Sequence, residues 1–225
     1  MKVIVFGATG MVGKGVLLEA LDSPDVEAVL AVGRSSCGVT HAKLRELLQK
    51  DLYEYAAVES ELKGYDACFF CLGVSSAGMN EADYTHITYD LTLAAARTLV
   101  KLNPGMTFIY VSGASTDSTE KGRSMWARVK GKTENELLKL GFKGAYMFRP
   151  GYIHPLRGVT SRTPLYRVAI PLFKAIYPIA RAISPDSLTT SVNIGRAMIA
   201  AAKNGYSKPI LDPKDINALA GIGAP

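Results

Sequence analysis

The chain begins with a short apolar run that leads directly into a glycine-rich turn and then into a helical pattern. The run "KVIVF" (residues 2–6) is rich in β-branched residues, and "GATGMVGKG" follows it. Val12, Val16, Leu17 and Leu21 then recur at the spacing of one helix face. A strand, a glycine turn and a helix in this order open a βαβ unit, in which helices connect parallel strands. This feature limits the fold more than any other in the sequence.

Further apolar runs alternate with helical patterns along the rest of the chain. The predicted strands lie in "VEAVLAVG" (26–33), "YDACFFCLG" (65–73), "MTFIYVSG" (106–113) and "GAYMFRPG" (144–151). The clearest predicted helices are residues 88–102 and 128–140. Nearly continuous apolar strands between helices indicate a parallel sheet that is covered on both faces. We therefore predict an α/β, doubly wound (Rossmann-type) fold.

Two segments are harder to interpret. The composition of residues 43–52 favours a helix, but the βαβ order requires a third strand there, and we predict a strand. Between residues 164 and 185, prolines and basic residues both recur every seven positions. We expect one domain over residues 1–225, within which residues 152–190 form a small helical lid, substrate or homodimer-interface segment. A membrane-surface role is the alternative for this segment.

The glycines of the first turn predict a dinucleotide site. Gly7, Gly10 and Gly13 permit a tight turn, let the backbone approach a pyrophosphate, and allow a helix to pack closely on a strand. Free N–H groups at the start of the helix suit the phosphate charge. A purely structural turn is the alternative. The predicted contacts from this turn are Gly7, Thr9, Gly10, Met11, Val12 and Gly13.

The end of the second strand indicates which dinucleotide binds. An NAD site usually places an acid there, but this strand ends "AVGRSS" with Arg34 and Ser35. A guanidinium suits the 2′-phosphate of NADP and gains nothing from a bare hydroxyl. The sequence therefore predicts NADP rather than NAD, unless Arg34 is only a solvated surface residue.

Bulk properties exclude several classes of protein. The net charge of +6 has no dense basic run, so we expect small anionic ligands and no nucleic acid. Cys68 and Cys71 lie in a buried strand pattern, where residues three apart lie about 10 Å from each other. They are therefore predicted to pack rather than to bind metal or form a disulfide. We see no secretion signal and no transmembrane segment, and we expect a cytoplasmic protein.

Six motifs together resemble the short-chain dehydrogenase/reductase superfamily. They are "GATGMVG", "KDL", "CLG", "YVSGAS", "VKGKTENEL" and "FRPGYI". The resemblance is to the extended and atypical branches, which include sugar-nucleotide epimerases and proteins like the human Tat-interacting oxidoreductase. It covers nearly the whole chain, and it implies an NAD(P)-binding oxidoreductase or epimerase.

The resemblance also implies roles for individual residues. Asp51, with Leu52 beside it, would contact the adenine, and Lys130 would hold the nicotinamide ribose. Leu72 and Gly73 would pass under the cofactor, while Pro150 to Ile153 would line the nicotinamide. Ser112 would orient a carbonyl group, although Gly113 follows it where the family commonly has a second hydroxyl. Thr88 likewise stands near the position of a family asparagine.

The main departure is Trp126, which stands where the family has its catalytic tyrosine, four residues before Lys130. An indole N–H donates hydrogen bonds but has no acid–base equilibrium near neutral pH. Tyr84 or Tyr152 could supply the proton instead, as could water or the substrate. The chain could also bind NADP without turnover, or the assumed register could be wrong. His154 is a further candidate contact, although a single histidine is more often structural.

These observations lead to one main hypothesis and two alternatives. The main one is an NADP-dependent oxidoreductase that acts on a small carbonyl or alcohol. The first alternative is a non-catalytic NADP(H)-binding sensor or interaction protein. The second is a sugar-nucleotide epimerase or dehydratase, for which the C-terminal part is short.

Overall fold

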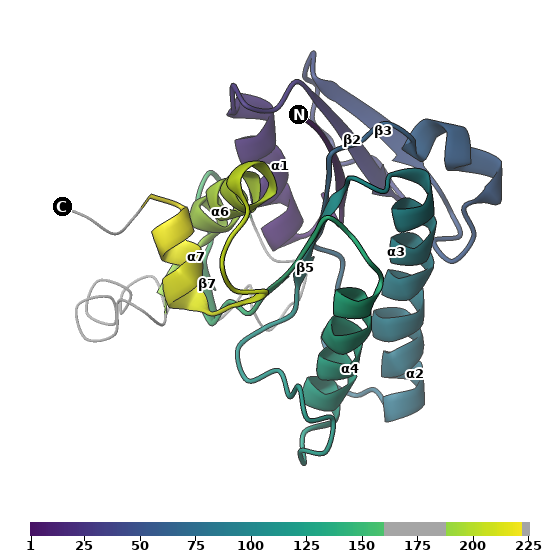
Figure 1. Ribbon diagram of the computed structural model, residues 1–225, viewed down its shortest axis with the longest axis vertical. Coiled ribbons are helices and arrows are strands. Elements are labelled where there is room, and N and C mark those ends of the chain that lie inside the picture. Colours follow the sequence, from purple (N-terminus) through teal and green to yellow (C-terminus); the bar gives the residue numbers. More distant parts are fainter. Residues whose placement is uncertain (160–187, 222–225) are drawn as a thin grey trace.

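The computed structural model describes residues 1–159 and 188–221. Within these ranges, seven strands form one parallel sheet in the order β3-β2-β1-β4-β5-β6-β9 (Figure 1). Its strands are β1 (Lys2–Phe6), β2 (Ala28–Gly33), β3 (Leu44–Leu48), β4 (Ala67–Phe70), β5 (Thr107–Val111), β6 (Gly144–Phe148) and β9 (Ile210–Leu211). A separate parallel pair joins β7 (Tyr152–His154) to β8 (Leu188–Thr190). The predicted doubly wound parallel sheet is confirmed.

Helices cover both faces of the large sheet. In Figure 1, α1, α6 and α7 lie on one side of the sheet, and α3 and α4 lie together on the other. The α-helices are α1 (Met11–Asp22), α2 (Glu81–Thr85), α3 (Leu91–Leu102), α4 (Met125–Lys139), α6 (Ser191–Asn204) and α7 (Pro213–Leu219). Two further helical segments are the 3₁₀ helix η1 (Ala56–Leu62) and the π-helical turn η2 (His86–Asp90), which leads into α3.

The central strand β1 shows why the sheet needs two helical layers. Val3 and Val5 pack into the core on the side of α1 and α6, whereas Ile4 and Phe6 pack on the side of α3 and α4. All four side chains are fully buried. Successive side chains of a strand point to opposite faces, so an uninterrupted apolar strand is stable only when both faces are covered.

The ambiguous segment 43–52 forms β3, which pairs in parallel with β2 from Leu44 to Leu48. Its helical composition is overridden because a helix here would leave the backbone N–H and C=O groups on the outer edge of β2 without strand partners, whereas β3 pairs with them. The predicted strand is confirmed.

Cys68 packs in a buried strand, as the sequence predicts. Cys68 is fully buried in β4, Cys71 is half-buried just after it, and both are free thiols. Burial raises the pKa of both thiols, so both stay protonated at neutral pH.

Part of the C-terminal prediction cannot be compared with the structure. Residues 160–187, which include the whole 164–185 repeat, lie outside the described residues, as do residues 222–225. The lid or interface role of residues 152–190 therefore stays a prediction.

Candidate functional site

The glycine turn joins β1 to α1 by a very close approach of backbones. Gly7 has φ +79°, and a Cβ there would lie 2.7 Å from the carbonyl carbon of Cys71. A Cβ on Gly13, in the first turn of α1, would overlap the Gly7 carbonyl oxygen. Only glycine fits both positions, because one has positive φ and the other has no room for a side chain.

Gly10 differs from its two neighbours in the motif. It has φ −87° at the N-cap of α1, and the nearest atom to a Cβ there would be Gly7 O at 3.4 Å. No side chain caps this helix, and its first turn carries no acid. The space above Gly10 is therefore open, and the N–H groups of the helix face it without a competing negative charge. This is the arrangement that binds a phosphate.

A first cavity of about 330 Å³ extends from this turn along the carboxyl ends of β1, β2 and β4. A ligand site is expected at this edge of a parallel sheet, where the strand order reverses. The predicted cofactor contacts that line the cavity are Gly7, Thr9, Gly10, Met11, Val12, Arg34, Ser35, Leu52, Leu72 and Gly73.

Two predicted contacts line neither this cavity nor the second one described below. Gly13 packs beneath Gly7, and its lack of a side chain lets α1 lie close to the turn. The Asp51 carboxylate instead accepts a hydrogen bond from the Tyr53 N–H at 2.8 Å, which closes a local turn. Leu52, which follows Asp51 in the sequence, does line the cavity.

The loop after β2 is held by a hydrogen-bonded clasp that no sequence pattern indicates. Glu46 Oε1 accepts from the Cys37 N–H at 2.6 Å, and Oε2 accepts from the Ser36 hydroxyl at 2.8 Å. Lys14 Nζ donates to Cys37 O at 2.6 Å. The hydrogen bonds that Glu46 accepts, chiefly the one from the Cys37 N–H, lower the pKa of its carboxyl. In the sequence, Glu46 looks like an ordinary solvent-facing strand residue, so its partners emerge only from the folded loop beside Arg34.

A second cavity adjoins the first and shares Val12, Cys71, Leu72 and Gly73 with it. Its other lining residues come from the ends of β5 and β6, from α4 and from β7: Val111, Ser112, Gly113, Ala114, Lys130, Pro150, Gly151 and Ile153. The structure thus brings together residues that the sequence assigned separately to the nicotinamide site and to catalysis.

Ser112 and Lys130 are linked directly. Lys130 Nζ donates to Ser112 O at 2.5 Å, and the Ser112 hydroxyl donates to Phe148 O at 3.1 Å. Ser112 is 8% exposed. Its hydroxyl proton is therefore committed to the backbone, and the ammonium is held against the strand end that lines the second cavity.

Trp126 lies one helical turn before Lys130 and next to Gly113, which lines the second cavity. A Cβ on Gly113 would come within 4.0 Å of Trp126 Cζ3. The proposed substitutes for the missing tyrosine do not reach this place: Tyr84 is buried in α2, Tyr152 lies on β7, and neither lines the two cavities. His154 and Thr88 are also outside both linings.

Comparison with known proteins gives a family match over more than half of the chain. The sequence model of the NAD dependent epimerase/dehydratase family matches residues 3–123. This range includes the glycine turn, the clasp around Arg34 and the end of β5.

Curated relatives match at the level of sequence. Protein FMP52-1, mitochondrial, from Scheffersomyces stipitis is 31% identical over 157 residues, which cover 68% of this chain and 67% of the relative. Protein FMP52, mitochondrial, from Meyerozyma guilliermondii is 28% identical over 68% of this chain and 65% of its own length. The chain thus spans about two thirds of the length of these relatives. Their mitochondrial names contradict the cytoplasmic location expected from the sequence, and that prediction is wrong.

Solved structures match at the level of the fold. The UDP-N-acetylglucosamine 4-epimerase of Methanobrevibacter ruminantium has a TM-score of 0.68 at 18% identity, with 91% of this chain and 74% of that chain covered. The dTDP-glucose 4,6-dehydratase DesIV of Streptomyces venezuelae, solved with NAD bound, has a TM-score of 0.67 at 17% identity, with 98% and 80% covered.

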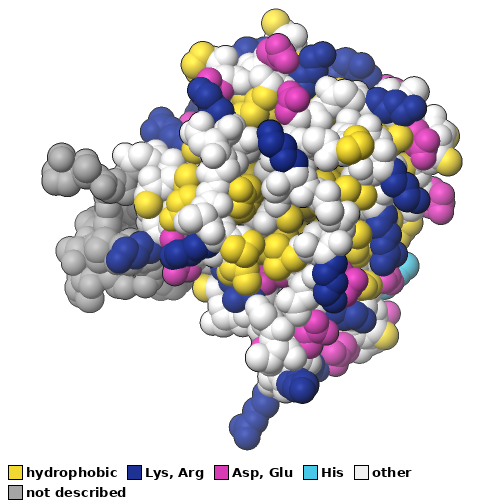
Figure 2. Space-filling model, in the orientation of Figure 1, with side chains coloured by type: hydrophobic (Ala, Val, Ile, Leu, Met, Phe, Trp, Pro, Cys, Tyr) yellow, Lys and Arg dark blue, Asp and Glu magenta, His cyan; other side chains and the backbone are white. Residues whose placement is uncertain are grey.

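Figure 2 shows Lys and Arg side chains spread over one face among acidic and apolar ones. Among residues 1–159 and 188–221, no helix has the length and apolar character needed to cross a membrane.

Proposed function

Because the chain belongs to the NAD dependent epimerase/dehydratase family, we propose that it binds NADP(H) and reduces a small carbonyl compound to an alcohol. The observation that supports this best is the pair of adjoining cavities. One carries the glycine turn and Arg34, and the other carries Lys130 beside the end of β5. A ligand with a phosphate-rich half and a reactive half matches this division.

The residues fit such a cofactor. The open space above Gly10 and the uncapped N-terminus of α1 suit the pyrophosphate. Leu72, Gly73 and Ile153 provide close, mainly apolar surface further along. When bound in its reduced form, the dinucleotide supplies a hydride to the substrate carbon. The protein's own contributions are to hold both molecules, to exclude water, and to move a proton to or from the substrate oxygen.

The clasp around Arg34 supports NADP over NAD. Glu46 is the carboxylate that lines the first cavity, but both of its oxygens accept hydrogen bonds from the loop itself. It is therefore less available to ribose hydroxyls, whereas the exposed Arg34 guanidinium is available to a phosphate.

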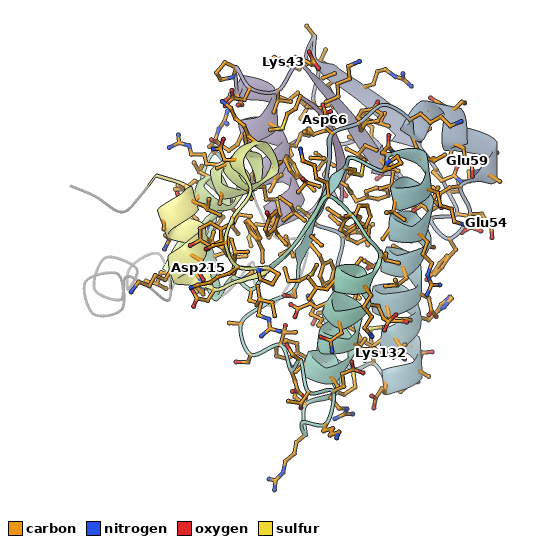
Figure 3. The ribbon with its side chains drawn as sticks, viewed as in Figure 1. Lys43, Glu54, Glu59, Asp66, Lys132 and Asp215 are labelled. Atoms are coloured by element: carbon orange, nitrogen blue, oxygen red, sulfur yellow. The ribbon has the colours of Figure 1, made fainter. Side chains whose placement is uncertain are left out.

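We predict that NADPH binds more tightly than NADH and that Arg34→Ala removes most of the difference. A charge-assisted contact of about 1.5–3 kcal/mol corresponds to roughly 10- to 100-fold in affinity. Calorimetric titration of both cofactors into both proteins measures this change. Lys43→Ala removes a cation from a half-buried lysine before β3 that lines neither cavity (Figure 3), so as the matched control it should leave both affinities unchanged. Equal affinities in the parent protein would contradict the assignment.

The enzymatic proposal is tested by NADPH oxidation with a panel of aldehydes and ketones, followed at the nicotinamide absorbance band. Carbonyl-dependent oxidation supports it. If NADPH binds tightly and no compound in the panel is reduced, the chain is a binding protein without turnover. Trp126 is the observation that favours this second function, because an indole cannot relay a proton.

Trp126→Tyr is expected to raise carbonyl reduction, by about tenfold in kcat. Residues four apart on a helix share a face, so a phenol at position 126 would lie beside the Lys130 ammonium, which favours its ionised form. Steady-state kinetics at saturating NADPH measure the change. Trp126→Phe, which provides a ring without a hydroxyl, is the control and should not show the increase. An equal increase in both variants would mean that only the space beside Gly113 matters.

A further inference from the structure

We propose that Lys130 is itself the proton donor to the substrate oxygen, in the place where the family uses a tyrosine. This inference rests on the proposed carbonyl reduction and adds to it the group that completes the reaction. It differs from the role that the family resemblance implies, in which the lysine only holds a ribose and assists a neighbouring phenol.

The position of Lys130 is suitable for this role. Its ammonium is fixed by Ser112 O at 2.5 Å and lies 5.9 Å from the centre of the Tyr110 ring. Lys130 lines the second cavity together with Pro150 and Ile153. An ammonium has three N–H donors, so the bond to Ser112 leaves others for an oxygen atom in the cavity.

The other polar side chains around this cavity are less suitable donors. Within the described residues, Cys71 is the other ionisable side chain in the lining, and burial raises the pKa of its thiol. The Ser112 hydroxyl donates to Phe148 O. Trp126 beside Gly113 cannot release a proton near neutral pH. Lys130 is thus the acid that this part of the structure places in the second cavity, where the substrate carbonyl is proposed to react.

The surroundings of Lys130 also bring its proton affinity into a useful range. Burial lowers the pKa of the ammonium to about 8, and the charge of Glu134, one helical turn further along α4, acts in the opposite direction. Glu134 is fully buried and paired with Arg149 from the end of β6. The Tyr110 phenol beneath Lys130 has a pKa raised by burial and stays neutral. A general acid works best when its pKa lies near the working pH.

The proposed step balances as follows. As the carbonyl carbon gains the hydride and its electron pair, the C=O π bond breaks, and the oxygen takes a proton from Lys130 Nζ. The product is the alcohol, and the neutral amine of Lys130 regains a proton from solvent. In the reverse direction, the neutral amine accepts the alcohol proton.

Lys130→Arg separates proton donation from charge. Arginine keeps the cation and its hydrogen bonds but does not release a proton in proteins. We expect NADPH affinity to stay within about threefold, while kcat at saturating NADPH falls on the order of 100-fold. Lys132→Arg is the matched control, because Lys132 is exposed on the same helix, over the Tyr89 ring (Figure 3). It should keep the parent rate.

The pH profile and a direct titration complete the test. In the parent, log kcat for reduction should fall above about pH 8, where Lys130 loses its proton, and Lys130→Arg should lose this limb. Acetic anhydride labelling of the cofactor-free parent, read by peptide mass spectrometry, should show Lys130 becoming reactive with a midpoint near pH 8. This readout needs no turnover and no folded variant.

Each outcome decides between the proposals. A parent that binds NADPH but reduces nothing removes both the proposed function and this inference. A parent that turns over, with Lys130→Arg retaining its rate, keeps the proposed function and overturns Lys130 as donor. A labelling midpoint near that of an exposed lysine also overturns it. Reduced turnover in Lys130→Arg with intact binding, a lost basic limb and a midpoint near 8 supports it.

Discussion

Gly10→Val is expected to abolish NADPH binding and leave the protein folded. The added side chain would project into the open space at the N-terminus of α1, where the pyrophosphate must lie. Gly10 has an extended backbone that valine tolerates, and its Cβ would meet Gly7 O only at 3.4 Å. The cost in unfolding free energy should therefore be about 1 kcal/mol, the usual loss at an N-cap.

Thermal unfolding with and without NADPH measures both effects at once. At 100 times its dissociation constant, the ligand should stabilise the parent by about 2.7 kcal/mol and the variant not at all. Gly105→Val is the matched control, because a Cβ there meets nothing within 4 Å and the site is far along the chain from the turn. If Gly10→Val is folded and still stabilised by NADPH, the glycine turn is only structural.

Gly131→Ala is expected to lower the free energy of unfolding by about 2 kcal/mol. A Cβ at Gly131 would overlap the carbonyl oxygen of Asp117, so the loop after β5 would have to move away from α4. Such overpacking costs up to about 3 kcal/mol, whereas alanine in a helix gains about 1 kcal/mol over glycine. The clash outweighs the propensity because a backbone atom cannot turn aside as a side chain can.

The loop that would move is well anchored. Ser118 accepts hydrogen bonds at its carbonyl from Asn135 and at its hydroxyl from Arg149. Calorimetry should therefore show a fall in Tm of roughly 4 to 8 °C. Gly105→Ala, on open surface, should leave Tm almost unchanged. A more stable Gly131→Ala protein would show that this loop yields without cost and that helix propensity dominates.

The fold was predictable because local patterns and tertiary packing agree. Each apolar run that was expected to be a strand is one, and even β3 followed from the βαβ order against its own composition. The glycine turn was also predictable, because its backbone requirements are local. Gly7 needs a positive φ and Gly10 needs open space, and both requirements are set within a few residues of sequence.

The site was less completely predictable. Glu46 and Lys14 reach the Arg34 loop from a neighbouring strand and from α1, and no spacing in the sequence shows that their side chains meet there. Asp51 has the expected sequence position, but its carboxylate turns back to the Tyr53 N–H. Tyr84 was a reasonable substitute acid until the structure placed it in the core, 2% exposed.

The sequence by itself determined the order of strands and helices, the place of the glycine turn, the absence of a tyrosine four residues before Lys130, and the family. These are local or periodic properties, written in neighbouring residues. Only the tertiary structure decided which polar groups share a cavity, which hydroxyls are committed to the backbone, and how strongly Lys130 holds its proton. Desolvation and hydrogen bonding depend on what surrounds a group in space, and for Lys130 those surroundings come from β5, β6 and a later turn of α4.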